Sequence, residues 1–224
     1  PLIFYPLSTL MLGGIREILI ITTPSDYESF KRLLGDGNSL GIELKYAIQQ
    51  SPDGVAQSLL IAEQFLNNCP SALILGDNIF YGNELVNILR EADNDENSAT
   101  SSTVFTYPVR DPENYGVIEF DNKGQPKNII EKPNKFLSRF AITGLYYYDS
   151  SAVEMVKNIE PSERGELEIS SLNQIYLDKK QLNIQKLGRG LAWLDTGTID
   201  NLIEASLYIR SIEHRQGLKI GCPE

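Results

Sequence analysis

The sequence of 224 residues is poor in the side chains that most often serve as catalytic bases, nucleophiles or zinc ligands. It has one histidine, His214, and two cysteines, Cys69 and Cys222, which stand far apart. Neither cysteine has a partner at metal-ligand spacing, and His214 lies in the charged segment IEHRQG, where a solvated helix histidine is the ordinary interpretation. This scarcity argues against a histidine-dependent hydrolase and against a histidine-rich zinc enzyme.

The sequence also lacks a recognisable secretion signal and any apolar run long enough to cross a bilayer. We therefore expect a reduced, cytoplasmic protein without a membrane span. Acidic residues outnumber basic ones, and the formal net charge is −10. This negative charge argues against a general binder of nucleic acid or of anionic membranes. No GxGxxG motif follows an expected strand, which disfavours a dinucleotide-dependent dehydrogenase.

What the sequence does contain is enough apolar residues, 42%, for a packed α/β domain. Strand-like and helical patterns alternate as far as Val109 with short loops between them. The alternation predicts an α/β fold with a Rossmann-like, doubly wound, mostly parallel sheet. We expect strands at residues 17–22, 43–50, 71–77 and 101–109, and helices at residues 2–12, 26–34, 54–68 and 83–93.

The pattern changes after Val109. The turn signal DNKG at residues 121–124 separates two strand-like runs and predicts a β-hairpin. We interpret this half as a mixed extension of the same sheet, so that residues 1–224 form a single domain. Further strands are expected at residues 140–149, 182–188 and 191–195, and further helices up to residue 157 and at 166–180 and 199–216.

Two aspartates stand at the ends of apolar strands: Asp77 in ALILGDNIFYG and Asp195 in LAWLDTGT. Ligands of open α/β sheets bind beyond the carboxyl ends of the strands. Two carboxylates placed there suit one Mg²⁺ ion, which takes few carboxylates and shares its other positions with phosphates and water. The alternative interpretation is that each aspartate caps the helix that follows it.

Two further segments carry polar groups suited to a nucleotide or a sugar phosphate. In QQSPDGVAQS, residues 49–58, a tight turn beside a helix start suits recognition of a planar base, although an ordinary loop is the alternative. In IEKP, Glu131 suits sugar hydroxyls and Lys132 suits a phosphate, provided that a strand end or twist turns both to one side; a surface ion pair is the alternative. Arg164 in RGELE suits an anion or simply a charged helix start.

Taken together, these segments resemble one family over essentially the whole chain. The stretches PLIFYPLSTLML, SPDGVAQS, LGDNIFYG, DPENYGVIEFD, RGLAWLDTGT and RQGLKIGCPE are similar to those of the glucose-1-phosphate thymidylyltransferases, a branch of the sugar nucleotidyltransferases. The resemblance implies an enzyme that joins dTTP and glucose 1-phosphate into dTDP-glucose and pyrophosphate with Mg²⁺. It also implies a homotetramer, with a nucleotide-binding part at residues 1–109 and a sugar-binding and assembly part at residues 110–224.

The resemblance assigns roles to individual residues. It implies that Asp77 and Asp195 bind the metal, that Asp77 also contacts the nucleotide, and that Lys132 and Arg164 are the catalytic contacts to the phosphates. The turn residues implied to recognise thymine are Gln49, Pro52 and Gly54. The positions implied to surround the glucosyl group are Asn78, Gly116, Glu131, Lys132, Ile142 and Tyr146.

The chain departs from the family in one respect. Family members begin with a strand, a GGxGTRL loop and a lysine in a KQLLPV-like stretch, and this chain contains none of them. We therefore expect the domain to lack its first βα unit, and with it the backbone cradle for the triphosphate. We expect the chain on its own to be inactive. The alternatives left open are a UTP- or CTP-using relative and a non-catalytic fragment that binds sugar phosphates.

Overall fold

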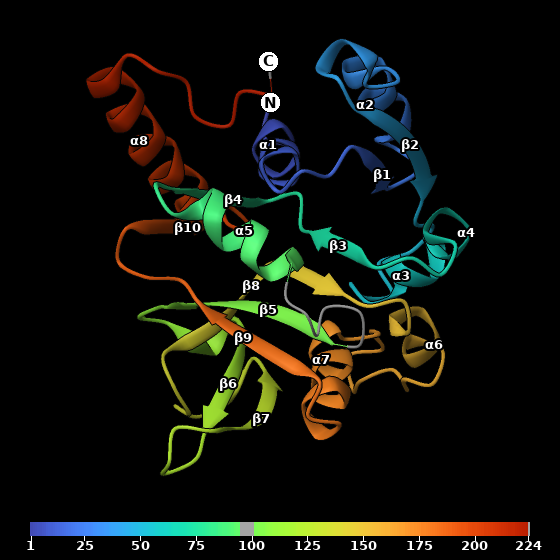
Figure 1. Cartoon of the computed structure of the whole chain (residues 1–224), viewed down its shortest axis with the longest axis vertical. Coiled ribbons are helices and arrows are strands. Elements are labelled where there is room, and N and C mark those ends of the chain that lie inside the picture. Colours follow the sequence, from blue (N-terminus) through green and yellow to red (C-terminus); the bar gives the residue numbers. More distant parts are fainter. Residues whose placement is uncertain (95–100, 224) are drawn as a thin grey trace.

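A computed structural model describes residues 1–94 and 101–223. Two strands near the beginning of the chain, β1 (Glu17–Thr22) and β2 (Glu43–Ile48), pair in parallel, with Glu17 opposite Glu43. Helix α1 (Phe4–Leu12) precedes them, and α2 (Tyr27–Leu34) with the short 3₁₀ turn at Asn38–Leu40 connects them. Figure 1 shows this part of the molecule, with α8, at the opposite end from the β6–β7 hairpin.

A larger, mixed sheet contains strands from both halves of the chain. Its order is β7 (Pro126–Glu131), β6 (Gly116–Phe120), β8 (Phe140–Tyr148), β5 (Ser102–Pro108) and β9 (Leu182–Lys186), and β3 (Ser71–Ile74) also pairs with β8. Strands β5 and β9 are parallel, whereas β8 is antiparallel to β3, β5 and β6. The predicted α/β class is confirmed. The sheet is mixed because β8, a strand of the second half, lies between β3 and β5.

The hairpin predicted around DNKG is present as β6 and β7, which pair antiparallel. Asp121 Oδ1 accepts hydrogen bonds from the backbone N–H groups of Lys123 and Gln125, both at 2.8 Å, and so holds the turn. A third strand pair is formed by β4 (Asn78–Gly82) and β10 (Leu191–Asp195), which are antiparallel. Strand β4 was not expected from the sequence, because its run NIFYG is short and follows a polar Gly-Asp-Asn segment.

The remaining helices cover the sheets and connect the strands. The expected helix at residues 54–68 is divided into α3 (Gln57–Ile61) and α4 (Glu63–Leu66). The helices α5 (Leu85–Asn94), α6 (Ala152–Val156), α7 (Ile169–Asp178) and α8 (Ile199–Gln216) agree closely with expectation, and a 3₁₀ turn occupies Pro112–Asn114. Within the described residues, no helix combines the length and the apolarity that crossing a membrane requires.

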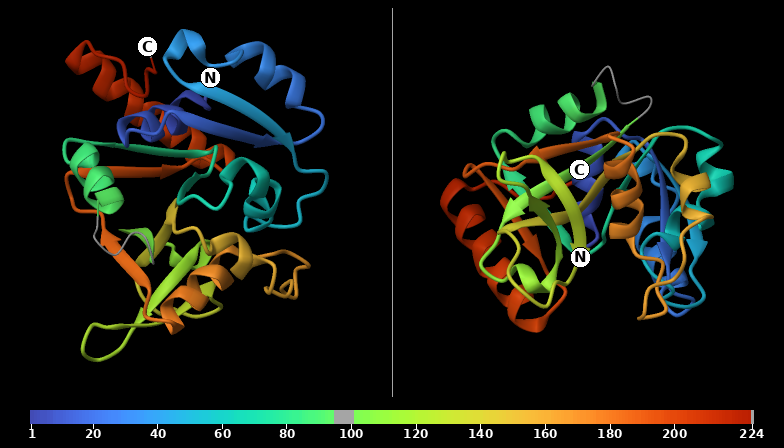
Figure 2. Two further views of the ribbon diagram at one scale, coloured as in Figure 1. Left: turned by 45° about the vertical axis from the view of Figure 1, so that its right-hand side comes forward. Right: turned by 90° about the horizontal axis from the view of Figure 1, so that it is seen from below.

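A cavity of about 610 Å³ lies between β1 and β3. Its wall includes the β1 residues 17–21, the β3 residues 71–74 and apolar side chains of α1 and α3. In the part of the chain that the structure describes, β1 pairs only with β2 and β3 only with β8, so each strand leaves one edge without a neighbour. Figure 2 gives two further views of this region, which lies beside the end of β3 that leads into Asp77.

Candidate active site

A second cavity, of about 210 Å³, lies where β7, β8 and β10 meet the loop after β3 and the beginning of α7. All the predicted site residues line this cavity except Gln49, Pro52 and Gly54. The predicted residues found together in its wall are Asp77, Asn78, Gly116, Glu131, Lys132, Ile142, Tyr146, Arg164 and Asp195. The fold thus brings together residues that are separated by more than a hundred positions in the sequence.

The carboxylates of Asp77 and Asp195 face the same point beside Gly197. A Cβ atom placed on Gly197 would lie 3.2 Å from Asp195 Oδ1 and 3.5 Å from Asp77 Oδ2. The absence of a side chain there keeps the space between the two acids open. Burial is the largest cause of a raised pKa at Asp195, and the neighbouring charges of Asp77 and Asp111 raise this pKa further.

The backbone explains why the two acids meet. Strands β4 and β10 pair with Asn78 opposite Asp195, so Asp77 stands next to the end of β10. Thr196 donates from its backbone N–H and from Oγ1 to the carbonyl oxygen of Asp77, at 3.0 and 2.8 Å. These bonds fix the two strand ends relative to each other.

The alternative that each aspartate caps a helix is wrong for both positions. Asp77 is followed by a strand, β4, and not by a helix. Helix α8 is capped by Thr198, whose Oγ1 accepts a hydrogen bond from the backbone N–H of Asn201 at 3.2 Å. Within the described residues, no group of three or more His, Cys, Asp or Glu side chains is arranged to hold a metal, so the two aspartates are a pair and not part of a larger cluster.

Asn78 is buried and connects three elements of the site. Its Oδ1 accepts hydrogen bonds from the backbone N–H of Gly144, at 3.0 Å, and from Nε1 of Trp193, at 2.6 Å. Its Nδ2 donates to Asp77 Oδ1 at 2.8 Å. Through these three hydrogen bonds, Asn78 fixes the positions of β8, β10 and the Asp77 carboxylate relative to one another.

Glu131 and Lys132 face the same cavity although they are adjacent in sequence. Glu131 ends β7, and Lys132 has a backbone φ of +42°, a left-handed conformation that turns the chain at the strand end. For a residue other than glycine this conformation costs about 1–2 kcal/mol. Burial, with the nearby charge of Glu168, raises the pKa of Glu131. Among the described residues Lys132 belongs to no ion pair, so the surface-ion-pair alternative is not what the structure shows.

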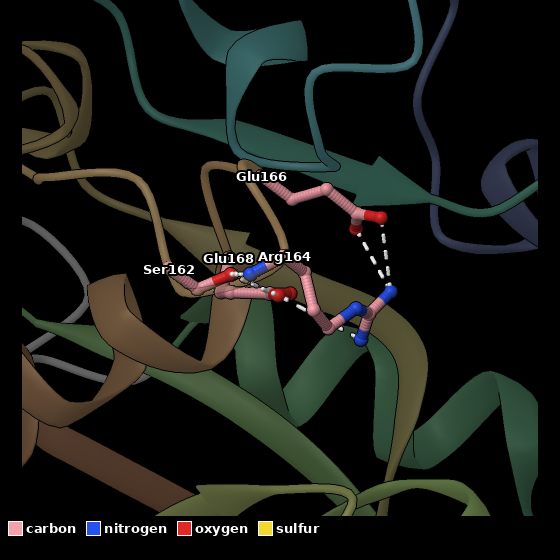
Figure 3. A network of polar contacts seen from close by, with 4 residues as sticks. All are labelled: Ser162, Arg164, Glu166 and Glu168. Carbon is pink, nitrogen blue, oxygen red and sulfur yellow. Dashed lines mark hydrogen bonds and ion pairs between the residues drawn. The ribbon is translucent and has the colours of Figure 1, made fainter.

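Arg164 lies in a loop before α7, so the interpretation as a charged helix start is wrong, since α7 begins only at Ile169. Its Nη2 donates to both carboxylate oxygens of Glu166 at 3.0 Å, and its Nη1 lies 3.7 Å from Glu168 Oε1. Ser162 accepts from the backbone N–H of Arg164 and donates to Glu168, as Figure 3 shows. The guanidinium is therefore held at the cavity by acids of its own loop.

The turn at residues 49–57 is adjacent to the cavity, which it enters only at Val55. Gln49 Nε2 donates to the carbonyl oxygen of Gly54 at 3.2 Å, which shapes the turn. The turn is also attached to the Arg164 loop. The backbone N–H of Leu167 donates to the carbonyl oxygen of Asp53 at 2.7 Å. The backbone N–H of Ala56 donates to the carbonyl oxygen of Leu167 at 3.1 Å.

Sequence reasoning missed several residues of the cavity wall. Tyr115 and Trp193 lie edge to face with ring centroids 5.2 Å apart, and burial raises the pKa of Tyr115 to about 12. An aromatic residue within two positions of a predicted site residue, as in NYG and AWLD, is the signal that could have identified both. The other missed members are Val55, Leu75, Asn114, Gly144, Glu166, Glu168, Ile169, Ser170 and Asn173.

Comparison with known proteins gives this geometry its context. Residues 1–212 match the family model described as nucleotidyl transferase. The chain belongs to the nucleotidyl transferase family. Within the family, the whole chain is 54% identical to the glucose-1-phosphate thymidylyltransferase of Xanthomonas campestris pv. campestris strain B100 and covers 75% of that protein. It is 51% identical to the enzyme of the same name from Neisseria meningitidis serogroup A and covers 77% of it.

Solved nucleotidyl transferase structures share the fold. A protein of Bacillus anthracis, described as a candidate glucose-1-phosphate thymidylyltransferase in complex with sucrose, superposes with a TM-score of 0.84 at 33% identity, over 94% of this chain and 82% of that one. A UDP-glucose pyrophosphorylase complexed with UDP-glucose has a TM-score of 0.79 at 22% identity, over 95% of this chain and 87% of that one, a likeness of fold alone. These neighbours agree with the Rossmann-like α/β class.

Proposed function

We propose that this nucleotidyl transferase is a glucose-1-phosphate thymidylyltransferase, which forms dTDP-glucose and pyrophosphate from dTTP and glucose 1-phosphate. The observation that carries the proposal is the convergence of two carboxylates, a lysine and an arginine on one cavity: Asp77, Asp195, Lys132 and Arg164. Relatives with this name that are about half identical over the whole chain support the choice of nucleotide and sugar. No observation favours UTP or CTP over dTTP.

In the proposed reaction, a phosphate oxygen of glucose 1-phosphate attacks the α-phosphorus of dTTP. The bond from the α-phosphorus to the bridging oxygen breaks, and pyrophosphate leaves with that electron pair. The sugar phosphate is already ionised at neutral pH, so the step needs position and positive charge more than a base. This agrees with a site whose described lining residues include no histidine and no cysteine.

The residues of the cavity divide naturally between the two substrates. Lys132, turned toward the cavity by its left-handed backbone, is assigned to the attacking phosphate, and Glu131 accepts hydrogen bonds from the sugar. Arg164 is assigned to the diphosphate. Its guanidinium now donates hydrogen bonds to both carboxylate oxygens of Glu166, so it must release Glu166 in order to bind a phosphate oxygen. The turn that carries Gln49, Pro52 and Gly54 is assigned to the thymine base.

The donor set fits Mg²⁺. Asp77 and Asp195 are hard oxygen ligands at one point, and Gly197 leaves that point free of side-chain atoms. Two carboxylates are what a Mg²⁺ site in phosphoryl transfer uses when phosphates supply further oxygens. When bound there, the ion neutralises charge on the triphosphate.

We also propose that one further strand, the first strand of the family's βα unit, completes the domain in the cavity between β1 and β3. The support is that two strands, each with one edge that pairs with no other described strand, border a space of about 610 Å³ lined mainly by apolar side chains. A strand seated there would pair with both neighbours and fill the space. The division into a nucleotide-binding part at residues 1–109 and a sugar-binding and assembly part at residues 110–224 belongs to the same proposal.

We further propose that the enzyme is a cytoplasmic homo-oligomer, a homotetramer by its resemblance to the family, and that it binds neither membranes nor nucleic acid. Support for self-association comes from α8, where Ile199, Ile203 and Leu207 share one face and are 78%, 53% and 56% exposed. Apolar side chains grouped in this way mark contact surfaces. Light scattering coupled to size-exclusion chromatography measures the number of subunits directly.

The decisive experiment uses the polypeptide as its gene encodes it. The protein is incubated with Mg²⁺, glucose 1-phosphate and either dTTP, UTP or CTP, and the nucleotide sugar and pyrophosphate are measured by chromatography. We expect dTDP-glucose and pyrophosphate in equal amounts, with dTTP preferred. A preference for UTP or CTP would establish the first alternative, and binding of glucose 1-phosphate without turnover would establish a non-catalytic module.

A further inference from the structure

The turn at residues 49–57 contains a chain of side-chain hydrogen bonds that leads to Gln49. Oδ2 of Asp53 accepts one hydrogen bond from Oγ of Ser51 and another from Nε2 of Gln57, the latter at 2.8 Å. Oε1 of Gln57 accepts in turn from Nε2 of Gln49 at 2.7 Å. A carboxylate and two amides are thus connected in series.

The Asp53 carboxylate determines the direction of each bond in this chain. The hydrogen bonds from Ser51 and Gln57 lower the pKa of Asp53, so the group is ionised at neutral pH and can only accept. The atom of Gln57 that faces Asp53 must therefore be its nitrogen, which turns Oε1 toward Gln49. For the same reason, the atom of Gln49 that faces Gln57 must be its nitrogen.

The backbone of the turn holds Gln49 in the same orientation. Nε2 of Gln49 also donates to the carbonyl oxygen of Gly54 at 3.2 Å, and a carbonyl oxygen can only accept. Both N–H groups of the amide are therefore used inside the turn. Oε1 of Gln49 accepts no hydrogen bond from the described residues and is not one of their buried, unpartnered atoms, so it is accessible. Gln49 can thus offer a ligand only an acceptor.

Gln49 lies where ligands of such folds bind. It directly follows β2, and its backbone N–H donates to the carbonyl oxygen of Thr22, the last residue of β1, at 2.9 Å. Ligands of open α/β sheets bind beyond the carboxyl ends of parallel strands. Thymine and uracil carry an N–H group at ring position 3, whereas cytosine has an acceptor nitrogen there. A side chain that can only accept pairs with the first two bases and repels the third.

We propose that Asp53 and Gln57 are positioning residues, which fix the amide of Gln49 so that Oε1 accepts from the N3–H group of thymine. The polarity of this chain makes the turn select a base that donates at ring position 3. Asp53 and Gln57 act through Gln49 and determine specificity against cytosine. The inference rests on the proposed function, because it takes this turn to bind the base of dTTP.

The first test makes the chain reversible. Asp53→Asn supplies an amide that can donate to Gln57, so Gln57 and Gln49 can both reverse and present an N–H group to the base, although the Gly54 carbonyl opposes this. We expect the ratio of kcat/KM for dTTP to kcat/KM for dCTP to fall about two- to tenfold, the equivalent of one neutral hydrogen bond.

Asp36→Asn is the matched control for this test. Asp36 also accepts from a side-chain amide, Nδ2 of Asn38 at 2.7 Å, but it precedes β2 and so lies at the other end of that strand from Gln49. This variant should keep the parent's ratio of dTTP to dCTP use.

The second test reverses the chain deliberately. Gln49→Glu keeps an acceptor for the base but places a carboxylate against Oε1 of Gln57, which Asp53 prevents from turning. Alone, this change should lower kcat/KM for dTTP about tenfold. In the double variant Gln49→Glu/Asp53→Asn, Gln57 can donate to the introduced carboxylate and accept from the introduced amide. The double variant should therefore use dTTP better than Gln49→Glu, a rescue that a purely structural role of Asp53 does not predict.

Other results would overturn the inference. An equal loss with dTTP and dCTP in Asp53→Asn, or a double variant no better than Gln49→Glu, would show that Asp53 only shapes the turn. Thermal melts check that each variant is folded, and equilibrium binding of dTTP and dCTP gives the same comparison for a variant with slow turnover. If the parent used dTTP and Gln49→Glu matched it, the inference alone would fail. If the parent neither bound nor used dTTP, the proposed function would fail, which the parent's own assay reveals first.

Discussion

Replacing Gly54 by alanine should disturb both proposed substrate sites at once, because this glycine lies against the backbone of Leu167. A Cβ atom at Gly54 would stand 2.4 Å from the carbonyl oxygen of Leu167 and 2.5 Å from its nitrogen. Backbone atoms cannot move aside as a side chain can. The two hydrogen bonds that join the turn to Leu167 would therefore have to lengthen or break.

The size of the effect follows from two separate costs. Gly54 has a φ of +106°, which an L-residue rarely adopts, and such strain costs about 1–3 kcal/mol. The overlap with Leu167 adds a packing cost of about 1–3 kcal/mol. The variant should therefore lose about 2–6 kcal/mol of unfolding free energy in a urea titration.

Gly124 provides the matched control. It also has a positive φ, +75°, but a Cβ there would meet nothing within 4 Å. Gly124→Ala should therefore carry the strain of about 1 kcal/mol without the overlap, and it lies in the hairpin turn away from the cavity. The difference between the two variants isolates the contact with Leu167.

The kinetic effect of Gly54→Ala tests whether the turn at residues 49–57 only recognises the base or also holds the Arg164 loop in place. Leu167 is three residues from Arg164, so displacement of Leu167 should misplace the guanidinium as well as the turn at residues 49–57, which is proposed to bind thymine. We expect Gly54→Ala to raise the KM for glucose 1-phosphate as well as the KM for dTTP, measured below the unfolding temperature. If only the KM for dTTP rose while stability matched that of Gly124→Ala, the attachment of the turn to the Arg164 loop would have no functional role.

Lys132→Ala should weaken the use of glucose 1-phosphate about ten- to a hundredfold with little effect on dTTP binding, since the proposed charge-assisted contact is lost. Lys127→Ala is the control, because Lys127 lies on β7, the strand that ends just before Lys132, and is paired with Glu119; equal responses would refute the assignment. Asp195→Asn should raise the melting temperature without Mg²⁺ near neutral pH, because the raised pKa of Asp195 means that its charged form destabilises the folded protein once the pH exceeds that pKa. The gain should vanish as the pH falls through the raised pKa, and a gain that persisted in acid would contradict this cause. Residues 1–224 expressed alone should form no dTDP-glucose, whereas the same residues joined behind the first βα unit of the Xanthomonas campestris relative should; circular dichroism must show that the shorter chain is folded, and comparable rates would exclude a role for the glycine-rich loop of that unit.

Much of the fold could be predicted from the sequence because its signals are local. The strand at Glu17–Thr22 and the helix at Ile199–Gln216 were expected with the bounds that the structure shows. Period and end signals suffice for such elements. Pairing between distant strands leaves no local signal, and so the antiparallel position of β8 between β3 and β5 could not be foreseen.

The candidate site shows the same division. Asp77, Asp195, Glu131 and Lys132 could be named because each stands at the end of an apolar strand. The left-handed backbone at Lys132 could only be stated as a condition, since sequence spacing places adjacent strand residues on opposite faces. Asn173 carried no signal, because a polar residue in an amphipathic helix is ordinarily exposed and this one is fully buried.

Strand β3 connects the cavity between β1 and β3 to the proposed metal site. Strand β3 forms one wall of that cavity and leads within three residues of its end, Ile74, to Asp77. On the other side, Asp77 is fixed by Thr196 and by Asn78, which in turn binds Trp193 and Gly144. The carboxylate therefore has firm support from β8 and β10, whereas the strand that leads to it, β3, has one edge that pairs with no other described strand. A strand seated beside β3 would order the segment from Ile74 to Asp77, so completing the sheet would also position the proposed metal ligand.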